Sequence, residues 1–254
     1  MGEMDVSITV MIKTQRYMII FVHLQSFIKK EVMLIVIEGL DGSGKSTQVA
    51  RMSEYLTLRD GRSPEYLHFP RFDAPVVGDM IARFLRGEFG RIDQVHPMIV
   101  ALLFAEDRRD ASAMIRGWLK EGRTVLLDRY VYSNIAFQCA KIDDADRSLE
   151  LQRWILDTEY GVYDIPRPDL NVFLDVPVSF VRERLSNARE GSDREYLHGA
   201  EDIHEADMAF QKRVRDVYLR LCASDPDFRR IDCAGPGGEM LSADEVFEKI
   251  REVL

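Results

Sequence analysis

Short apolar runs alternate with longer stretches of helical character along this chain. Mostly apolar runs occupy residues 34–37, 124–127 and 170–174, and mixed runs of similar length occupy residues 66–69 and 228–232. Runs of this length are typical of strands that are buried on both faces of a parallel sheet. The pattern therefore predicts five strands.

Helical segments separate these runs. They cover residues 47–58, 77–85, 97–120, 143–158, a stretch from Pro177, and residues 210–221 and 243–254. Alternation of strands and helices predicts an α/β fold: a parallel five-stranded sheet with helices on both faces. Residues 132–138 mix apolar and hydrogen-bonding side chains, and we assign no element to them.

A glycine-rich motif follows the first apolar run. Residues 39–46 read GLDGSGKS and fit the phosphate-loop pattern G-x-x-x-x-G-K-[ST]. Its glycines let backbone N–H groups surround a phosphate chain, and the next helix adds its positive dipole end. The plainer alternative is a glycine-rich turn, but the flanking strand and helix favour binding of a nucleoside triphosphate. The predicted ATP-binding residues are Gly39, Leu40, Asp41, Gly42, Ser43, Gly44, Lys45, Ser46 and Thr47.

Composition narrows the class of protein. The chain has 254 residues, of which 46% are hydrophobic and 30% charged, which suits one globular domain. Its 34 basic and 43 acidic residues give a net charge of −9, which argues against a broad nucleic-acid surface. The three cysteines lack metal-ligand spacing, which favours a cytoplasmic protein.

The first 32 residues differ from the rest. They contain a short apolar stretch that lacks a cleavage site and is too short to span a bilayer, so we expect no membrane association. We interpret residues 1–32 as an extension of uncertain role and residues 33–254 as the domain.

Polar side chains, most of them charged, follow two of the predicted strands. Arg71 comes after the second run, and Asp128, Arg129 and Tyr130 come after the third. In open α/β sheets, ligands bind at the carboxyl ends of the strands. An acid at this place in a phosphate-loop protein is usually near Mg²⁺, so Asp128 joins Ser46 as a predicted metal residue. The alternative is that Asp128 caps the next helix.

Together these motifs resemble those of the thymidylate kinase family. Besides the phosphate loop, the matching segments are FPR at 69–71, LFAEDR at 103–108, DRY at 128–130, Ser133, Gln138, and PDL at 168–170 with the run to Asp175. They have the family's order and spacing over about residues 33–254. The resemblance implies a nucleoside monophosphate kinase that phosphorylates dTMP to dTDP with ATP and Mg²⁺ for dTTP synthesis. It also implies small-molecule substrates and a homodimer.

The resemblance implies which residues hold the base. Phe104 would stack on thymine, and Arg108 would hydrogen-bond to its edge. Ser133 and Gln138 would complete the base pocket. Without the family, Phe104 could be a core residue, and Arg108 could belong to a solvated face of its helix.

The resemblance also implies how the rest of the acceptor is bound. Arg71 and Arg129 would hold its monophosphate, which suits the planar guanidinium group. Asp41 would meet the sugar 3′-hydroxyl, and Tyr130 would crowd the 2′ position. Asp128 would orient Mg²⁺ through its waters.

Residues 188–205 have the composition of a mobile active-site lid. Some family members carry a basic residue in the phosphate loop where this chain has Gly42. We therefore hypothesise that Arg189, Arg194 or both supply that charge, so the predicted catalytic residues are Lys45, Asp128, Arg129, Arg189 and Arg194. The alternative is that both arginines are solvated charges of the lid.

We assign no role to His68, His96 or His198. His204 and Glu205 fall where the family has residues near the nucleoside, but the lid matches the family poorly. Two rival functions stay open: a kinase of another nucleoside monophosphate or of a deoxynucleoside, and a nucleotide-dependent switch without transfer activity.

Overall fold

A parallel sheet of five strands organises the described part of the chain. The computed structural model describes residues 32–186, 192–199, 202–205 and 207–254. The strands lie in the order β2-β3-β1-β4-β5, and all neighbouring pairs are parallel. Their bounds are β1 Leu34–Gly39, β2 Glu65–His68, β3 Val125–Asp128, β4 Leu170–Asp175 and β5 Phe228–Asp232.

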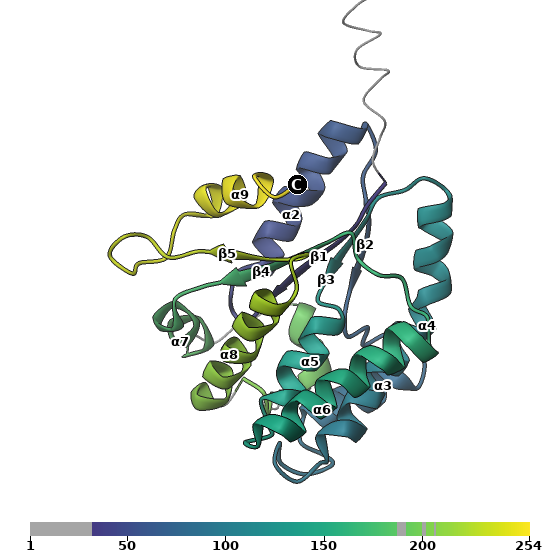
Figure 1. Cartoon of the computed structure of the whole chain (residues 1–254), viewed down its shortest axis with the longest axis vertical. Helices are drawn as coiled ribbons and strands as arrows, with labels where there is room; N and C mark the ends of the chain where they lie inside the picture. The colour runs from purple at the N-terminus through teal and green to yellow at the C-terminus, as the bar shows by residue number, and fades with distance from the viewer. Residues whose placement is uncertain (1–31, 187–191, 200–201, 206) are drawn as a thin grey trace, which may run out of the picture. The chain divides into compact units, whose positions relative to one another are not determined.

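Helices cover both faces of the sheet (Figure 1). Helices α2 and α9 pack on one face, and α4, α5 and α8 pack on the other, with α3 and α6 outside them. The helical bounds are α2 Lys45–Asp60, α3 Val77–Leu85, α4 Pro97–Lys120, α5 Val131–Cys139, α6 Ala145–Leu156, α7 Val178–Ser186, α8 Met208–Ser224 and α9 Ala243–Arg251. A π-helical turn, η1, covers Asp157–Val162, and a 3₁₀ turn, η2, covers Ser192–Leu197.

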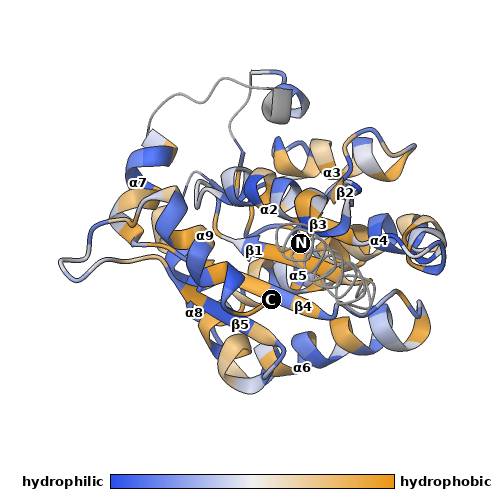
Figure 2. Ribbon diagram, turned by 90° about the horizontal axis from the view of Figure 1, so that it is seen from above, coloured by the Kyte–Doolittle hydropathy of each residue, from blue (hydrophilic) through white to orange (hydrophobic). Residues whose placement is uncertain are grey.

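The apolar runs form the centre of the core. Every residue of β1, β3 and β4 is buried, because helices cover both faces of these strands. Figure 2 shows the sheet as a mostly hydrophobic layer between helices with one hydrophilic side. The edge strands β2 and β5 are only partly buried. The predicted α/β fold with a five-stranded parallel sheet is confirmed.

Two elements depart from the predicted pattern. Helix α5 covers the stretch to which no element is assigned above, and all of its residues are buried. A helix covered on all sides lacks the polar face that makes helical periodicity visible. The predicted helix at 143–158 ends at Leu156, where the chain passes into η1.

Two predictions fall partly or wholly outside the described residues. Residues 1–31 lie outside, so the N-terminal extension stays a prediction. The predicted lid is described only at residues 192–199 and 202–205, and Arg189 lies outside. Within the described ranges, no helix has both the length and the apolar character needed to cross a membrane.

Candidate active site

The phosphate loop joins β1 to α2. Gly42 and Gly44 have φ angles of 73° and 84°, in the left-handed region that favours glycine. Lys45 begins α2, and its buried Nζ donates hydrogen bonds to the carbonyl oxygens of Gly39 (3.3 Å) and Leu40 (2.8 Å). The ammonium group therefore lies within the loop, close to where the motif places the outer phosphates.

The electrostatics of Lys45 are those of a desolvated cation. Burial and then the charge of Arg129 lower the pKa of Lys45 to about 8. The carboxylates of Asp128 and Asp41 oppose this shift. A polyanion such as ATP, entering the loop, would favour the charged form.

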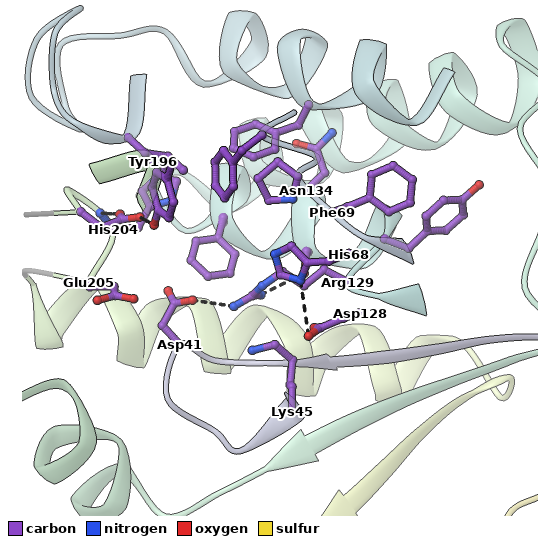
Figure 3. A pocket seen from close by; sticks show the side chains of 18 of the residues that line it. Asp41, Lys45, His68, Phe69, Asp128, Arg129, Asn134, Tyr196, His204 and Glu205 are labelled. Carbon is purple, nitrogen blue, oxygen red and sulfur yellow. Dashed lines mark hydrogen bonds and ion pairs between the residues drawn. The ribbon is translucent and has the colours of Figure 1, made fainter. Parts of the chain in front are cut away.

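Asp128 ends β3 beside the loop. Its side chain is buried, and its Oδ1 atom has no hydrogen-bond partner among the described residues. Its Oδ2 atom lies 3.4 Å from Nδ1 of His68 (Figure 3). Burial would raise the pKa of Asp128, but the contact with His68 and the charge of Lys45 outweigh it, and the pKa is lowered. Asp128 thus presents an ionised carboxylate with one unused oxygen.

This oxygen suits a magnesium ion. The hydroxyl residue Ser46 lines the same pocket, and Mg²⁺ prefers oxygen ligands. In the part of the chain that the structure describes, no three His, Cys, Asp or Glu side chains are grouped to hold a metal alone. A Mg²⁺ ion here would therefore draw its other ligands from phosphate and water, as this ion commonly does.

Arg129 ties the strand end to the loop. Its Nη1 atom donates to the Gly39 carbonyl (2.9 Å) and to Ser133 Oγ (3.1 Å), and Nη2 donates to Asp41 Oδ1 (2.6 Å). The guanidinium group also lies 5.1 Å from the ring centroid of Phe137. Burial would raise the pKa of Asp41, but Arg129 and then Lys45 lower it to about 2. Asp41 and Arg129 are therefore a fixed ion pair at neutral pH.

A second buried carboxylate, Glu38, caps helix α5. Its Oε1 atom accepts hydrogen bonds from the backbone N–H groups of Tyr130 (2.9 Å) and Ser133 (3.1 Å). The hydroxyl groups of Ser133 and Tyr218 donate to Oε2. Burial raises the pKa of Glu38 against these hydrogen bonds. The alternative that Asp128 caps this helix is therefore wrong.

The far end of the pocket is built on side chains of α4 and α5. Asn134 Nδ2 donates to the Ala101 carbonyl (3.0 Å) and to Glu159 Oε1 (2.9 Å). Its Oδ1 atom is buried and has no partner among the described residues. Arg108 is also buried and donates through Nη2 to Glu159 Oε1 (2.8 Å). Asn134 and Arg108 both line the pocket.

The burial of the side chains on α4 decides whether Arg108 belongs to a solvated face or to the pocket. Asp107 and Arg108 are buried, whereas Glu106 and Arg109 form an ion pair at the surface. A fully solvated face is therefore the wrong interpretation for Arg108. Phe104 packs edge-on against Phe84, with ring centroids 6.5 Å apart, and also lines the pocket.

Most of the predicted substrate-binding residues meet in this pocket. Those that line it are Asp41, Phe104, Arg108, Arg129, Tyr130, Ser133 and Gln138. Tyr130 is buried, and its hydroxyl donates to the Pro166 carbonyl (3.1 Å). Arg71 is the exception: its guanidinium donates to Asp107 Oδ1 (2.8 Å) and Asp110 Oδ2 (2.7 Å), and it does not line the pocket. Its role at the phosphate stays a prediction.

Turn η2 and the segment that follows it add lining residues that the sequence predicts weakly or not at all. Tyr196, Asp202, His204 and Glu205 all line the pocket. Tyr196 stacks on Phe72 with centroids 3.8 Å apart, and its hydroxyl donates to Asp202 Oδ2 (2.7 Å). Burial and the nearby charge of Asp41 raise the pKa of Asp202 to about 7.

His204 is the most enclosed of these residues. Its ring lies among the rings of Phe84, Phe137 and Phe210, and its Nε2 atom has no partner among the described residues. Burial lowers the pKa of His204 well below its usual value, so the ring is neutral. The sequence indicates a role for His204 only through its position in the predicted lid. His68 gives no such signal, although it also lines the pocket.

A buried lysine in a phosphate loop, a carboxylate with an unused oxygen and a pocket beside them define a phosphate-loop phosphotransferase. Comparison with known proteins is more specific. The family model described as thymidylate kinase matches residues 37–242. The thymidylate kinase of Mycobacterium tuberculosis is 37% identical over 192 residues, which cover 75% of this chain and 86% of that protein.

Two further relatives agree. The thymidylate kinase of Arabidopsis thaliana is 30% identical over 233 residues, which cover 92% of this chain and 74% of that protein. The structure of thymidylate kinase from Candida albicans aligns with a TM-score of 0.64 and 28% identity, covering 87% of this chain and 90% of that one. This chain belongs to the thymidylate kinase family and is a nucleotide-binding nucleoside monophosphate kinase.

Proposed function

We propose that this protein transfers the γ-phosphoryl group of ATP to dTMP, forming dTDP and ADP and so supplying dTTP synthesis. The observation that carries the choice of base is the polarity of Asn134. Both hydrogens of its amide are used, on Ala101 and Glu159, so the group it offers to the pocket is the acceptor Oδ1.

This polarity fits the edge of thymine. The thymine ring has a donor, N3–H, between two carbonyl acceptors, so N3–H can donate to Asn134 Oδ1. Arg108 uses Nε and Nη2 on Glu159, which leaves Nη1 to donate to a thymine carbonyl. Cytosine has an unprotonated N3, and its lone pair would face the Oδ1 lone pairs without a proton between them. A buried mismatch of this kind is costly.

The phosphate end supports transfer chemistry. An oxygen of the dTMP phosphate attacks the γ-phosphorus of ATP, and the bond from that phosphorus to the β–γ bridging oxygen breaks as ADP leaves. Lys45 would neutralise charge on the outer phosphates, and Arg129, already held by three acceptors, would orient the acceptor phosphate without reorganisation. Ser46 and Asp128 would hold Mg²⁺, which offsets charge on the phosphate oxygens when it is bound.

The remaining roles are part of this proposal. Asp41 would meet the sugar 3′-hydroxyl, and the buried ring of Tyr130 would disfavour a 2′-hydroxyl. Arg71 would reach the monophosphate after leaving the carboxylates of α4. Arg189 or Arg194 would add positive charge at the transferring group.

The test is a coupled assay of ADP release with dTMP, dUMP, dCMP and dGMP, and without an acceptor. We expect the fastest turnover with dTMP. We expect slower turnover with dUMP, which shares the imide edge, and little with dCMP or dGMP. ADP release that needs no acceptor, or a preference for dCMP, would contradict the proposal. A nucleotide-dependent switch would show no transfer to any of the four.

We further propose a homodimer in a cytoplasmic setting. The homodimer is supported by the family resemblance, and the setting by the spacing of the three cysteines. Light scattering after size exclusion should give twice the mass of one chain. A mass equal to that of one chain, at the concentrations used for the assay, would contradict the proposed homodimer.

A further inference from the structure

The π-helical turn η1 delivers one carboxylate to the interior. Helix α6 ends at Leu156, and the next six residues form the wider turn, closed by a hydrogen bond from Tyr163 N to Thr158 O (2.8 Å). Turns of this type are rare and occur often at functional sites. Glu159 lies within η1 and is fully buried.

Glu159 touches the base end of the pocket only through other residues. Its carboxylate accepts from Nε and Nη2 of Arg108 on α4 and from Nδ2 of Asn134 on α5. Arg108 and Asn134 line the pocket, whereas Glu159 does not. One side chain therefore contacts both groups that face the base edge.

The chemistry of a carboxylate fixes the orientation of the Asn134 amide. An ionised carboxylate accepts hydrogen bonds and donates none, so Asn134 must turn its NH₂ group toward Glu159. The Ala101 carbonyl accepts the second hydrogen (3.0 Å). Turning the amide over would bring its oxygen against two acceptors. An amide at position 159 could donate instead, and would remove one of the two acceptors that oppose the turned orientation of Asn134; the Ala101 carbonyl would remain.

We infer that Glu159 is a positioning residue that sets the hydrogen-bond polarity of the base end, and so selects pyrimidines that carry N3–H over amino-pyrimidines. The inference rests on the proposed function, because it takes Asn134 and Arg108 as the groups that face the acceptor base. It assigns the selectivity to a residue on η1 that never meets the substrate.

The test is the substitution Glu159→Gln, which keeps the size of the side chain and removes the charge. We expect kcat/KM for dTMP to fall about 10- to 100-fold, the effect of weakening one charge-assisted hydrogen bond, mostly through a higher KM. The ratio of kcat/KM for dTMP over dCMP should fall at least tenfold, because one of the two acceptors that hold the Asn134 amide in this orientation is then lost. The KM for ATP should stay within twofold, which a general loss of structure would not give.

Glu106→Gln is a matched control. Glu106 also joins α4 to the chain near η1, through the Tyr163 hydroxyl, and pairs with Arg109 at the surface away from the pocket. This variant should keep the wild-type ratio of dTMP over dCMP. A folded Glu159→Gln variant with wild-type KM for dTMP and a wild-type ratio would overturn the inference. Failure of the wild type to phosphorylate dTMP would instead overturn the proposed function.

A measurement on the wild type covers the case in which Glu159→Gln does not fold. With ¹⁵N-labelled asparagine, the side-chain amide of Asn134 should show two separate hydrogen signals, both exchanging slowly with water, before and after dTMP is added. Asn134→Ala assigns the signals by their loss. Fast exchange of either hydrogen in the free protein would show that the amide is not fixed, and would overturn the inference.

Discussion

The two ends of the pocket are built in different ways. At the phosphate end, the ligand-facing groups come from one short loop and from the strand end at residues 128–129, and many of them are backbone groups. At the base end, Arg108 and its partner Glu159 are 51 residues apart, and Asn134 and Glu159 are 25 apart. The phosphate loop is therefore specified locally, and the parallel pairing of β1 with β3 adds Arg129, which is 88 residues from Asp41. The base end contains no local motif, and long-range packing specifies it.

This difference predicts different sensitivities. Removing charge at the phosphate end should lower the rate of transfer for every acceptor, because those groups act on phosphates that all acceptors share. Removing a polar group at the base end should change which acceptor is used. The substitutions below are ordered from the largest expected effect to the smallest.

Lys45→Ala should lower kcat by at least about 10³-fold, because no other positively charged side chain belongs to the loop at residues 39–46. Far-UV circular dichroism and the melting temperature should stay near wild type, since the lysine is desolvated and adds little packing. Lys120→Ala, in the last turn of α4, is a control with the same change at an exposed position. Near-normal turnover by Lys45→Ala would remove the phosphate-loop mechanism.

The double variant Arg189→Ala with Arg194→Ala should lower kcat at saturating ATP and dTMP by roughly 10³-fold, as loss of a catalytic arginine does in related phosphoryl transfer. The two single variants show which arginine carries the effect. Wild-type turnover by the double variant would mean that the loop and strand ends supply the charge, or that Arg182 or Arg184 does.

Asn134→Ala should lower kcat/KM for dTMP about 10- to 100-fold while leaving the KM for ATP unchanged, because the groups that lose a partner, Ala101, Glu159 and the base, all lie at the base end. The preference for dTMP over dCMP should narrow, since the unmatched acceptor is gone. Steady-state kinetics with both acceptors test this. An equal loss for dTMP and dCMP would place Asn134 outside base selection.

Asp202→Asn should have the smallest effect, on stability. The pKa of Asp202 is raised from 3.8 to about 7 in the folded protein, so its buried charge costs stability above pH 7, and the cost disappears as the pH falls toward 3.8. The melting temperature of the variant relative to wild type should therefore be higher at pH 8 than at pH 5, by about 2–4 °C. If the buried charge of Asp202 did not lower stability, the difference in melting temperature between the variant and the wild type would be the same from pH 5 to pH 8.

The sequence predicts the phosphate end in detail because its physics is local. The apolar run, the glycines and Lys45 are adjacent in the chain, and Asp128 and Arg129 follow a strand whose end must lie beside β1. The family resemblance adds Phe104, Arg108, Ser133 and Gln138, which the structure places in the pocket lining.

No comparable pattern in the sequence predicts the buried groups that hold the pocket side chains in place, namely helix α5, Glu159 and Glu38. Helix α5 lacks an exposed face, so its period is hidden, and Glu159 lies in a π-helical turn that no periodicity marks. Glu38 lies in an apolar strand, where a carboxyl has no local explanation until α5 supplies its donors. For Arg71 the sequence predicts the position but not the contacts. The residue follows β2 as predicted, but its side chain is bound to carboxylates of α4.

The most direct test of the central claim is the affinity of the wild-type protein for dTMP and for N3-methyl-dTMP, measured by calorimetry. The methyl group removes the donor that Asn134 Oδ1 would accept and leaves the phosphate, the sugar and both thymine carbonyls in place. The account predicts at least about 100-fold weaker binding of the methylated nucleotide, since a buried acceptor loses its hydrogen-bond donor and faces a methyl group instead. Equal affinities would contradict the account, because the base would then not be read at Asn134.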